Sequence, residues 1–150
     1  MSGFTYDSFV AEMPCPVCGE LSPPDDSTGM QTAIRAEPQL AWLAPGDALS
    51  IEPAEMPQRG YLPVRPAADP THLLQTWSCP SCGASGNWAD VTVHGGTIES
   101  IVPTPLDRAA LSRAHFIDSE AKGVAAALSD RAFAEVPAEE VVPLLERLLP

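Results

Sequence analysis

The chain has 150 residues, with 20 Asp and Glu against 8 Lys and Arg and a formal net charge of −12. Residues 1–100 carry 12 of these acids and only 3 of the bases, a charge balance that repels phosphate backbones, so nucleic-acid binding is not expected. The length supports one hydrophobic core. We therefore expect a single domain over residues 1–150, β-rich in 15–103 and helical in 104–150.

The N-terminal sequence "MSGFTYDSFVAEMP" has no basic region followed by an apolar stretch, and no segment approaches the roughly 18 apolar residues that a membrane span needs. We expect a cytoplasmic protein without membrane contact. Because the cytoplasm is reducing, cysteines there are more often metal or redox sites than structural disulfides.

In chain order, residues 1–14 are expected to be a leader, a segment that precedes the folded part of the domain. Short β-like runs follow at residues 30–35 and 39–43, and the Pro-Gly sequence at 44–47 is typical of a tight turn. This pattern predicts an antiparallel meander. Recurrent prolines between residues 52 and 70 exclude a regular helix and favour extended edges and loops.

Two further β elements are expected before the helical part. Residues 73–77 predict a strand that leads into the second cysteine pair. Residues 88–102 predict a hairpin that turns at Gly95 and Gly96, where a positive φ costs little. Alternation places three apolar side chains on one face of its first arm: Ala89, Val91 and Val93.

The last third predicts three helices. Thr104 is a candidate N-terminal cap for residues 106–115, and residues 119–128 show helical apolar spacing. A third helix near the C-terminus starts or kinks near Pro143. Its apolar stripe suits either the core or a docking surface and comprises Val141, Leu144, Leu145 and Leu148. The expected fold class is α+β: an antiparallel β-sheet domain with C-terminal helices.

The four cysteines occur as two units of the same form, "CPVCG" and "CPSCG". Two such turns can surround one ion with four sulfurs, so the expected metal ligands are Cys15, Cys18, Cys79 and Cys82. These units resemble the metal knuckles of zinc-ribbon and rubredoxin-like proteins, including small bacterial ones. The resemblance covers the knuckles and the following hairpin. It departs in spacing, since 60 residues separate the two units where compact ribbons have roughly 15–20.

The resemblance implies one Zn²⁺ per chain in a structural role, because four cysteines leave no open coordination position. Iron in the same site would make a rubredoxin-like one-electron carrier. A zinc-thiolate redox sensor is a further alternative. Independent dithiol centres of the glutaredoxin kind are disfavoured, because neither pair opens a predicted helix.

The remaining polar residues form no recognisable catalytic motif, so no catalytic residue is assigned. Ordinary surface or capping roles are expected for His72, His94 and His115. Core positions are expected for Trp42, Trp77 and Trp88, with the last two shielding the metal, whereas an exposed Trp would indicate a binding surface. The sequence thus predicts a non-enzymatic zinc-binding protein. By analogy with inhibitor and immunity proteins, its acidic surface would meet a basic protein partner.

Overall fold

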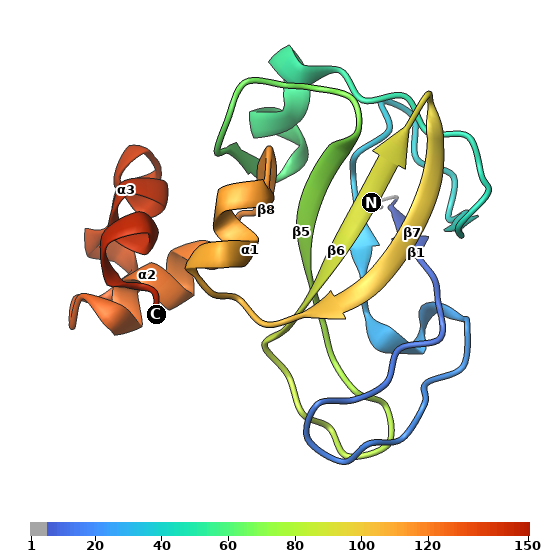
Figure 1. The fold of residues 1–150 in the computed structure, drawn as a ribbon, viewed down its shortest axis with the longest axis horizontal. Helices are drawn as coiled ribbons and strands as arrows, with labels where there is room; N and C mark the ends of the chain where they lie inside the picture. The colour runs from blue at the N-terminus through green and yellow to red at the C-terminus, as the bar shows by residue number, and fades with distance from the viewer. Residues whose placement is uncertain (1–5) are drawn as a thin grey trace, which may run out of the picture.

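The computed structural model describes residues 6–150, and a five-stranded sheet stands at its centre with the strand order β4-β8-β5-β6-β7 (Figure 1). The strands are β4 (Tyr61–Pro63), β5 (Thr71–Trp77), β6 (Asn87–His94), β7 (Thr97–Thr104) and β8 (Phe116–Asp118). Both predicted β elements of this region are present. β6 and β7 form the expected hairpin, and Gly95 and Gly96 at its turn have φ of +59° and +75°.

The sheet is mixed, which corrects the prediction of an antiparallel sheet. β8 lies within the part of the chain predicted as helical, and it pairs with β5 in parallel, with Leu73 opposite Phe116 and Leu74 opposite Ile117. Phe116 and Ile117 are both buried, so this short apolar run is stabilised as an inner strand between β4 and β5. Its three residues show no sequence periodicity strong enough to reveal it.

A second, three-stranded sheet has β1 (Asp7–Phe9) between β2 (Gln31–Thr32) and β3 (Trp42–Leu43). The expected meander is wrong in detail, because β2 and β3 each pair with β1, and β3 runs parallel to it. The leader prediction is also wrong for the described part of residues 1–14, since β1 is the central strand; residues 1–5 lie outside the described residues. In Figure 1 these N-terminal strands lie behind β6 and β7.

Each face of the five-stranded sheet contributes to a separate core. The first core lies toward the small sheet and contains Phe9, Leu73 and Trp77, together with the predicted apolar face of the hairpin, which is confirmed as buried: Ala89, Val91 and Val93. The second core lies against the helices and includes Leu74 and Trp88. The sheet therefore separates two apolar cores and contributes side chains to both.

The helical layer consists of α1 (Arg108–Arg113), α2 (Ala121–Leu128) and α3 (Ala138–Leu148), which pack together beside the sheet, next to its β8 side (Figure 1). Asp107, not Thr104, caps α1 and accepts the Ala110 N–H. The α3 stripe belongs to the second core, with Leu148 only partly buried. In residues 6–150 none of the helices has the length and apolar character that crossing a membrane requires.

Three short 3₁₀ segments complete the described chain: η1 (Asp26–Thr28), η2 (Pro53–Arg59) and η3 (Phe133–Glu135). The second corrects the expectation of only extended edges and loops between residues 52 and 70. Pro53 stands at the start of η2, where its missing N–H has no helical partner to lose. The prolines are therefore compatible with a 3₁₀-helix in this segment, although they disfavour an α-helix.

A buried carboxylate fixes the small sheet. The side chain of Asp7 is fully buried, and its two oxygens each lie 2.7 Å from a guanidinium nitrogen of Arg35. The N–H groups of Gln39 and Ala41 both donate to Oδ1 at 3.0 Å. Burial opposes ionisation of this carboxyl, but the four hydrogen bonds outweigh it and hold the Asp7 pKa below its usual value.

Replacing Asp7→Asn should lower the free energy of unfolding at pH 7 by about 2 kcal/mol, because the charge-assisted bonds to Arg35 are lost. The contribution of Asp7 is complete above its unfolded pKa of about 4 and disappears as the pH falls through the lower folded value. Denaturant titrations should therefore show a difference between the two proteins that shrinks below pH 4. Glu99→Gln, at an exposed position on β7, is the control; a constant difference across this range would contradict the account.

Candidate metal centre

The first cysteine unit forms a tight hairpin after β1. Pro14 and Leu21 make an isolated antiparallel bridge, and within it the Cys15 N–H donates to the Glu20 carbonyl at 3.0 Å. The Gly19 N–H donates back to the Cys15 carbonyl at 3.0 Å. Gly19 has φ of +78°, so the glycine after the second cysteine is required by the turn itself.

The second unit repeats this geometry between β5 and β6. The Cys79 N–H donates to the Ala84 carbonyl at 2.8 Å, and the Gly83 N–H donates to the Cys79 carbonyl at 2.9 Å. Gly83 has φ of +75°. The two sequence units are therefore also two copies of one backbone turn, and each presents its sulfurs toward the other.

The structure brings the four predicted cysteines together, with all four sulfur atoms within 4.8 Å of one another. The Sγ atoms of Cys15 and Cys82 are 3.8 Å apart, and those of Cys18 and Cys79 are 3.7 Å apart. A tetrahedral zinc ion with Zn–S bonds of about 2.3 Å requires sulfur separations of about 3.8 Å. The donor set and its spacing thus fit a four-coordinate metal ion.

Backbone N–H groups near the sulfurs shift the pKa values of the cysteine thiols. The N–H groups of Val17 and Cys18 donate to Cys15 Sγ at 3.3 and 3.4 Å. The Cys18 N–H contributes most and, with Val17, lowers the Cys15 pKa to about 6 despite burial. The pKa of Cys18 is lowered by the Glu20 N–H but raised more by burial and by the other sulfurs, to about 12. Four thiolates this close therefore need a cation to offset their mutual repulsion.

The four cysteines of the cluster differ in burial. Cys15 and Cys79 are buried, whereas Cys18 and Cys82 are exposed. The buried pair belongs to the first core together with Trp77, so one predicted shielding residue lies in the same apolar cluster as the sulfurs. Trp88 departs from the prediction, because it belongs to the second core, on the helical side of the sheet.

The three histidines do not join the sulfurs. Nδ1 of His72 lies 3.0 Å from both carboxylate oxygens of Asp90, and Nδ1 of His115 accepts the backbone N–H of His72 at 2.9 Å. His94 lies 3.1 Å from an oxygen of Asp69. Among residues 6–150 the four cysteines are the only group of three or more such side chains placed to hold a metal ion.

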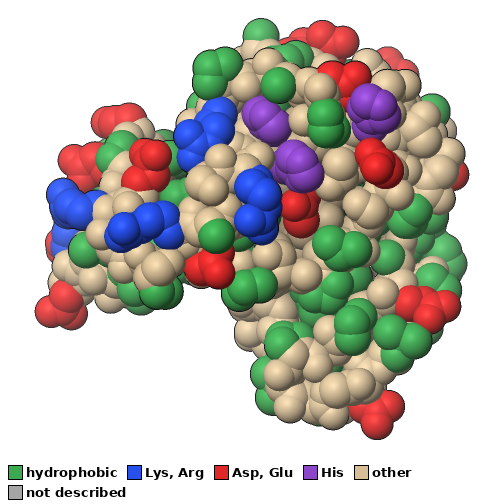
Figure 2. Space-filling model, in the orientation of Figure 1, with side chains coloured by type: hydrophobic (Ala, Val, Ile, Leu, Met, Phe, Trp, Pro, Cys, Tyr) green, Lys and Arg blue, Asp and Glu red, His purple; other side chains and the backbone are tan. Residues whose placement is uncertain are grey.

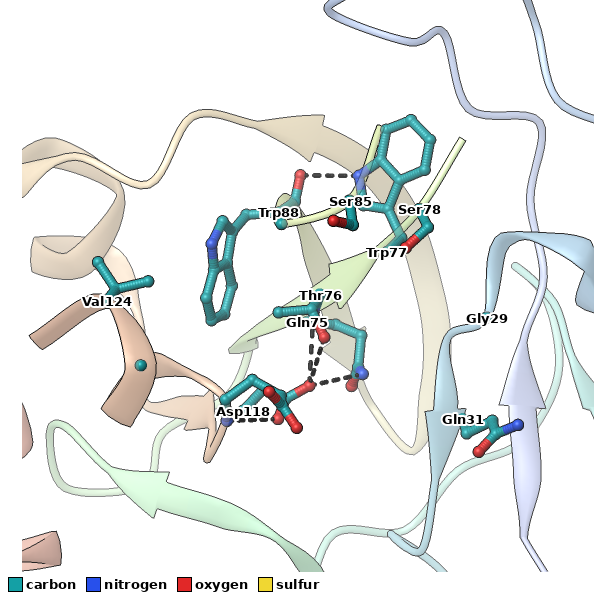
Figure 3. A pocket seen from close by; sticks show the side chains of 13 residues that line it. Gly29, Gln31, Gln75, Thr76, Trp77, Ser78, Ser85, Trp88, Asp118 and Val124 are labelled. Atoms are coloured by element: carbon teal, nitrogen blue, oxygen red, sulfur yellow. Dashed lines mark hydrogen bonds between the residues drawn. The ribbon is translucent and has the colours of Figure 1, made fainter. Parts of the chain in front are cut away.

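A cavity of about 580 Å³ lies beside the second cysteine unit, between β5, β8 and α2 (Figure 3). Its lining combines two indole rings with several polar side chains: Trp77, Trp88, Gln31, Gln75, Thr76, Ser78, Ser85, Asp118 and Glu120. No sequence motif indicates this cavity, because the residues that line it come from segments far apart in the chain.

A chain of hydrogen bonds links several of the residues that line this cavity. Tyr61 donates its hydroxyl hydrogen to Gln75 Oε1 at 2.6 Å, and Gln75 Nε2 donates to Asp118 Oδ2 at 3.0 Å. Thr76 Oγ1 donates to the same oxygen at 2.9 Å, and the Glu120 N–H donates to Oδ1 at 3.0 Å (Figure 3). Asp118 therefore ties β8 to β5 and to the start of α2, which is a structural role for this carboxylate.

Comparison with protein-family models, with curated proteins and with solved structures finds no match to this chain. The chemistry of the centre therefore follows from its own geometry. That geometry is a four-sulfur cluster that can bind a metal ion and that joins two distant parts of the chain.

Replacing Cys79→Ser should abolish stoichiometric metal binding and lower the melting temperature by more than 10 °C, because one ligand and its buried sulfur contacts are lost. Ser81→Ala is the matched control, since this exposed residue lies in the same turn and contributes no sulfur. Metal content by elemental mass spectrometry and melting by circular dichroism would be measured on both proteins. A Cys79→Ser protein that keeps one metal and the wild-type melting temperature would contradict the role of the cluster.

Proposed function

We propose that Cys15, Cys18, Cys79 and Cys82 bind one zinc ion in a structural role. The observation that carries this proposal is the spacing of the four sulfurs, 3.7 and 3.8 Å for the two cross-unit pairs, which suits tetrahedral Zn–S coordination. Four protein ligands leave no position for water or substrate. The ion would therefore hold the fold together and perform no hydrolysis.

Energetics support a structural ion despite the long insertion. The two units are separated by 60 residues, and lengthening a closed loop threefold adds only about 1 kcal/mol of entropic cost. Structural zinc binding contributes roughly 10–16 kcal/mol in small zinc domains. The free energy of zinc binding therefore exceeds the cost of this spacing, and the inserted β2, β3, β4 and β5 can form parts of both sheets.

For the protein as a whole, we propose a non-enzymatic interaction module whose acidic surface meets a basic protein. The net charge of −12 supports this, because such a field accelerates encounter with a positively charged partner. In Figure 2 the Lys and Arg side chains gather over the helices and the adjoining sheet edge, and the rest of that face shows none.

A zinc-thiolate redox sensor is the second candidate, favoured by the exposure of Cys18 and Cys82. Hydrogen peroxide would oxidise two thiolates to a disulfide, with its own reduction to two hydroxide ions, and the site would lose its zinc. Zinc release after one equivalent of peroxide at neutral pH would support this function. Retention of zinc under these conditions would contradict the redox sensor and agree with a structural role for the ion.

Native mass spectrometry of the protein isolated from its own host tests the main proposal. We expect one zinc per chain and a retained protein partner of basic composition, whose binding weakens as salt is raised because charge attraction is screened. One iron in place of zinc, with no partner, would contradict the proposal and indicate an electron carrier. Zinc with no basic partner at low salt would contradict the interaction module alone.

A further inference from the structure

Two large apolar side chains lie exposed within three residues of one another, at Leu40 and Trp42. Leu40 is 64% exposed and Trp42 is 53% exposed, whereas Trp77 and Trp88 are buried. The prediction that Trp42 belongs to the core is therefore wrong. We call residues 40–42 the Leu40–Trp42 surface; an exposed indole of this kind is a frequent binding hot spot.

The backbone at Leu40 is held in a conformation that this residue rarely adopts. Its φ is +57°, in the left-handed region that glycine or asparagine normally occupies. The N–H groups on either side, of Gln39 and Ala41, both donate to the buried Asp7 carboxylate. The ion pair with Arg35 fixes that carboxylate in turn. A strained residue stabilised from beneath, with its side chain in solvent, is a pattern typical of binding sites.

The strand at this surface also has a free edge. Ser8 and Val10 donate their N–H groups to the carbonyls of Ala41 and Leu43 at 2.9 and 3.0 Å. Since backbone groups alternate in direction along a strand, the N–H and C=O of Trp42 point to the opposite edge of β3. In the sheet order β2-β1-β3 no described strand pairs with that edge. At the next position on this edge the Ala44 N–H donates to Asp47 Oδ2 at 2.8 Å, so the backbone groups open to an incoming strand are those of Trp42.

The charge around the surface selects the kind of strand. Residues 36–47 contain Glu37 and Asp47 and no Lys or Arg. Arg35, which precedes this segment, is already bound by Asp7. Both carboxyl-bearing residues are exposed, so the segment presents negative charge beside an apolar centre. Lys and Arg side chains on an incoming strand would be attracted here, and acidic ones repelled.

We propose that the Leu40–Trp42 surface binds an extended segment of a basic partner protein, which pairs with the free edge of β3 and packs an apolar side chain against Trp42 between Lys or Arg residues. The basic partner rests on the proposed function, and the surface gives that partner a place and a conformation. Main-chain hydrogen bonds would supply affinity, while the indole and the nearby carboxylates would supply selectivity.

The test is a titration of the zinc-loaded, ¹⁵N-labelled full chain with the acetylated, amidated hexapeptide Lys-Val-Lys-Val-Lys-Val, followed by NMR. We expect saturable shifts of the Trp42 indole and backbone N–H signals and of their β3 neighbours. The matched peptide with Glu in place of Lys should bind at least tenfold more weakly. No shifts at β3, or equal binding of the two peptides, would overturn the proposal.

Two variants separate binding from folding. Leu40→Gly removes the side chain while suiting the positive φ, so the melting temperature should be unchanged or higher and peptide binding should weaken severalfold. Trp42→Ala should weaken binding about tenfold. Val102→Ala changes another exposed apolar residue, on β7, and should bind as the wild type does. Wild-type binding by both surface variants would overturn the proposal.

Sedimentation velocity over a hundredfold concentration range tests a second copy of this chain as the occupant. A dimer that Trp42→Ala abolishes would overturn the basic-partner proposal in favour of self-association. A protein that retains zinc and a basic partner in native mass spectrometry but shows no peptide shifts at β3 would overturn this surface alone. If native mass spectrometry finds no basic partner and the peptide causes no shifts at β3, the interaction module would be overturned as well.

Discussion

The meeting of the two cysteine units is the constraint on which the arrangement of the two sheets depends. The first unit follows β1, the central strand of the small sheet, and the second connects β5 to β6 in the large one. An ion bound by all four sulfurs would therefore join the sheets at one end. The hydrogen bond from Ser78 N–H to the Thr28 carbonyl, 2.9 Å long, lies next to the second unit and reinforces the same junction.

A junction of this kind explains how so short an N-terminal sheet remains ordered. Its strands have only two or three residues each, fewer than an isolated sheet needs for stability. Phe9 and Met13 in this part of the chain are completely buried in the first core, and the Asp7 carboxylate holds the loop between β2 and β3. Apolar burial, one partly buried ion pair and the sulfur cluster thus act on the same small element. The second core, under the helices, contains none of the cysteines.

The parts of the fold that were predictable from the sequence are those with local signals. The β6–β7 hairpin follows from alternation and from Gly95–Gly96, and the clustering of the cysteines follows from two identical turn motifs. β1, β8 and the Asp118 network were missed because their stabilising partners lie far along the chain; Gln75 and Asp118, for example, are 43 residues apart. Trp42 was misplaced for a related reason, since composition alone favours burial of an indole, while its exposure depends on the face of β3 from which it projects. Leu43 packs into the first core, and Trp42 projects from the opposite face.

X-ray absorption at the zinc edge of the purified protein reports the metal and its ligands together, so it is the decisive measurement for the sulfur cluster. We expect one zinc per chain surrounded by four sulfur atoms at about 2.3 Å, with no light-atom ligand. Fewer than four sulfurs, with nitrogen or oxygen completing the shell, would contradict the closed four-cysteine site. So would a protein that retains its fold and contains no metal.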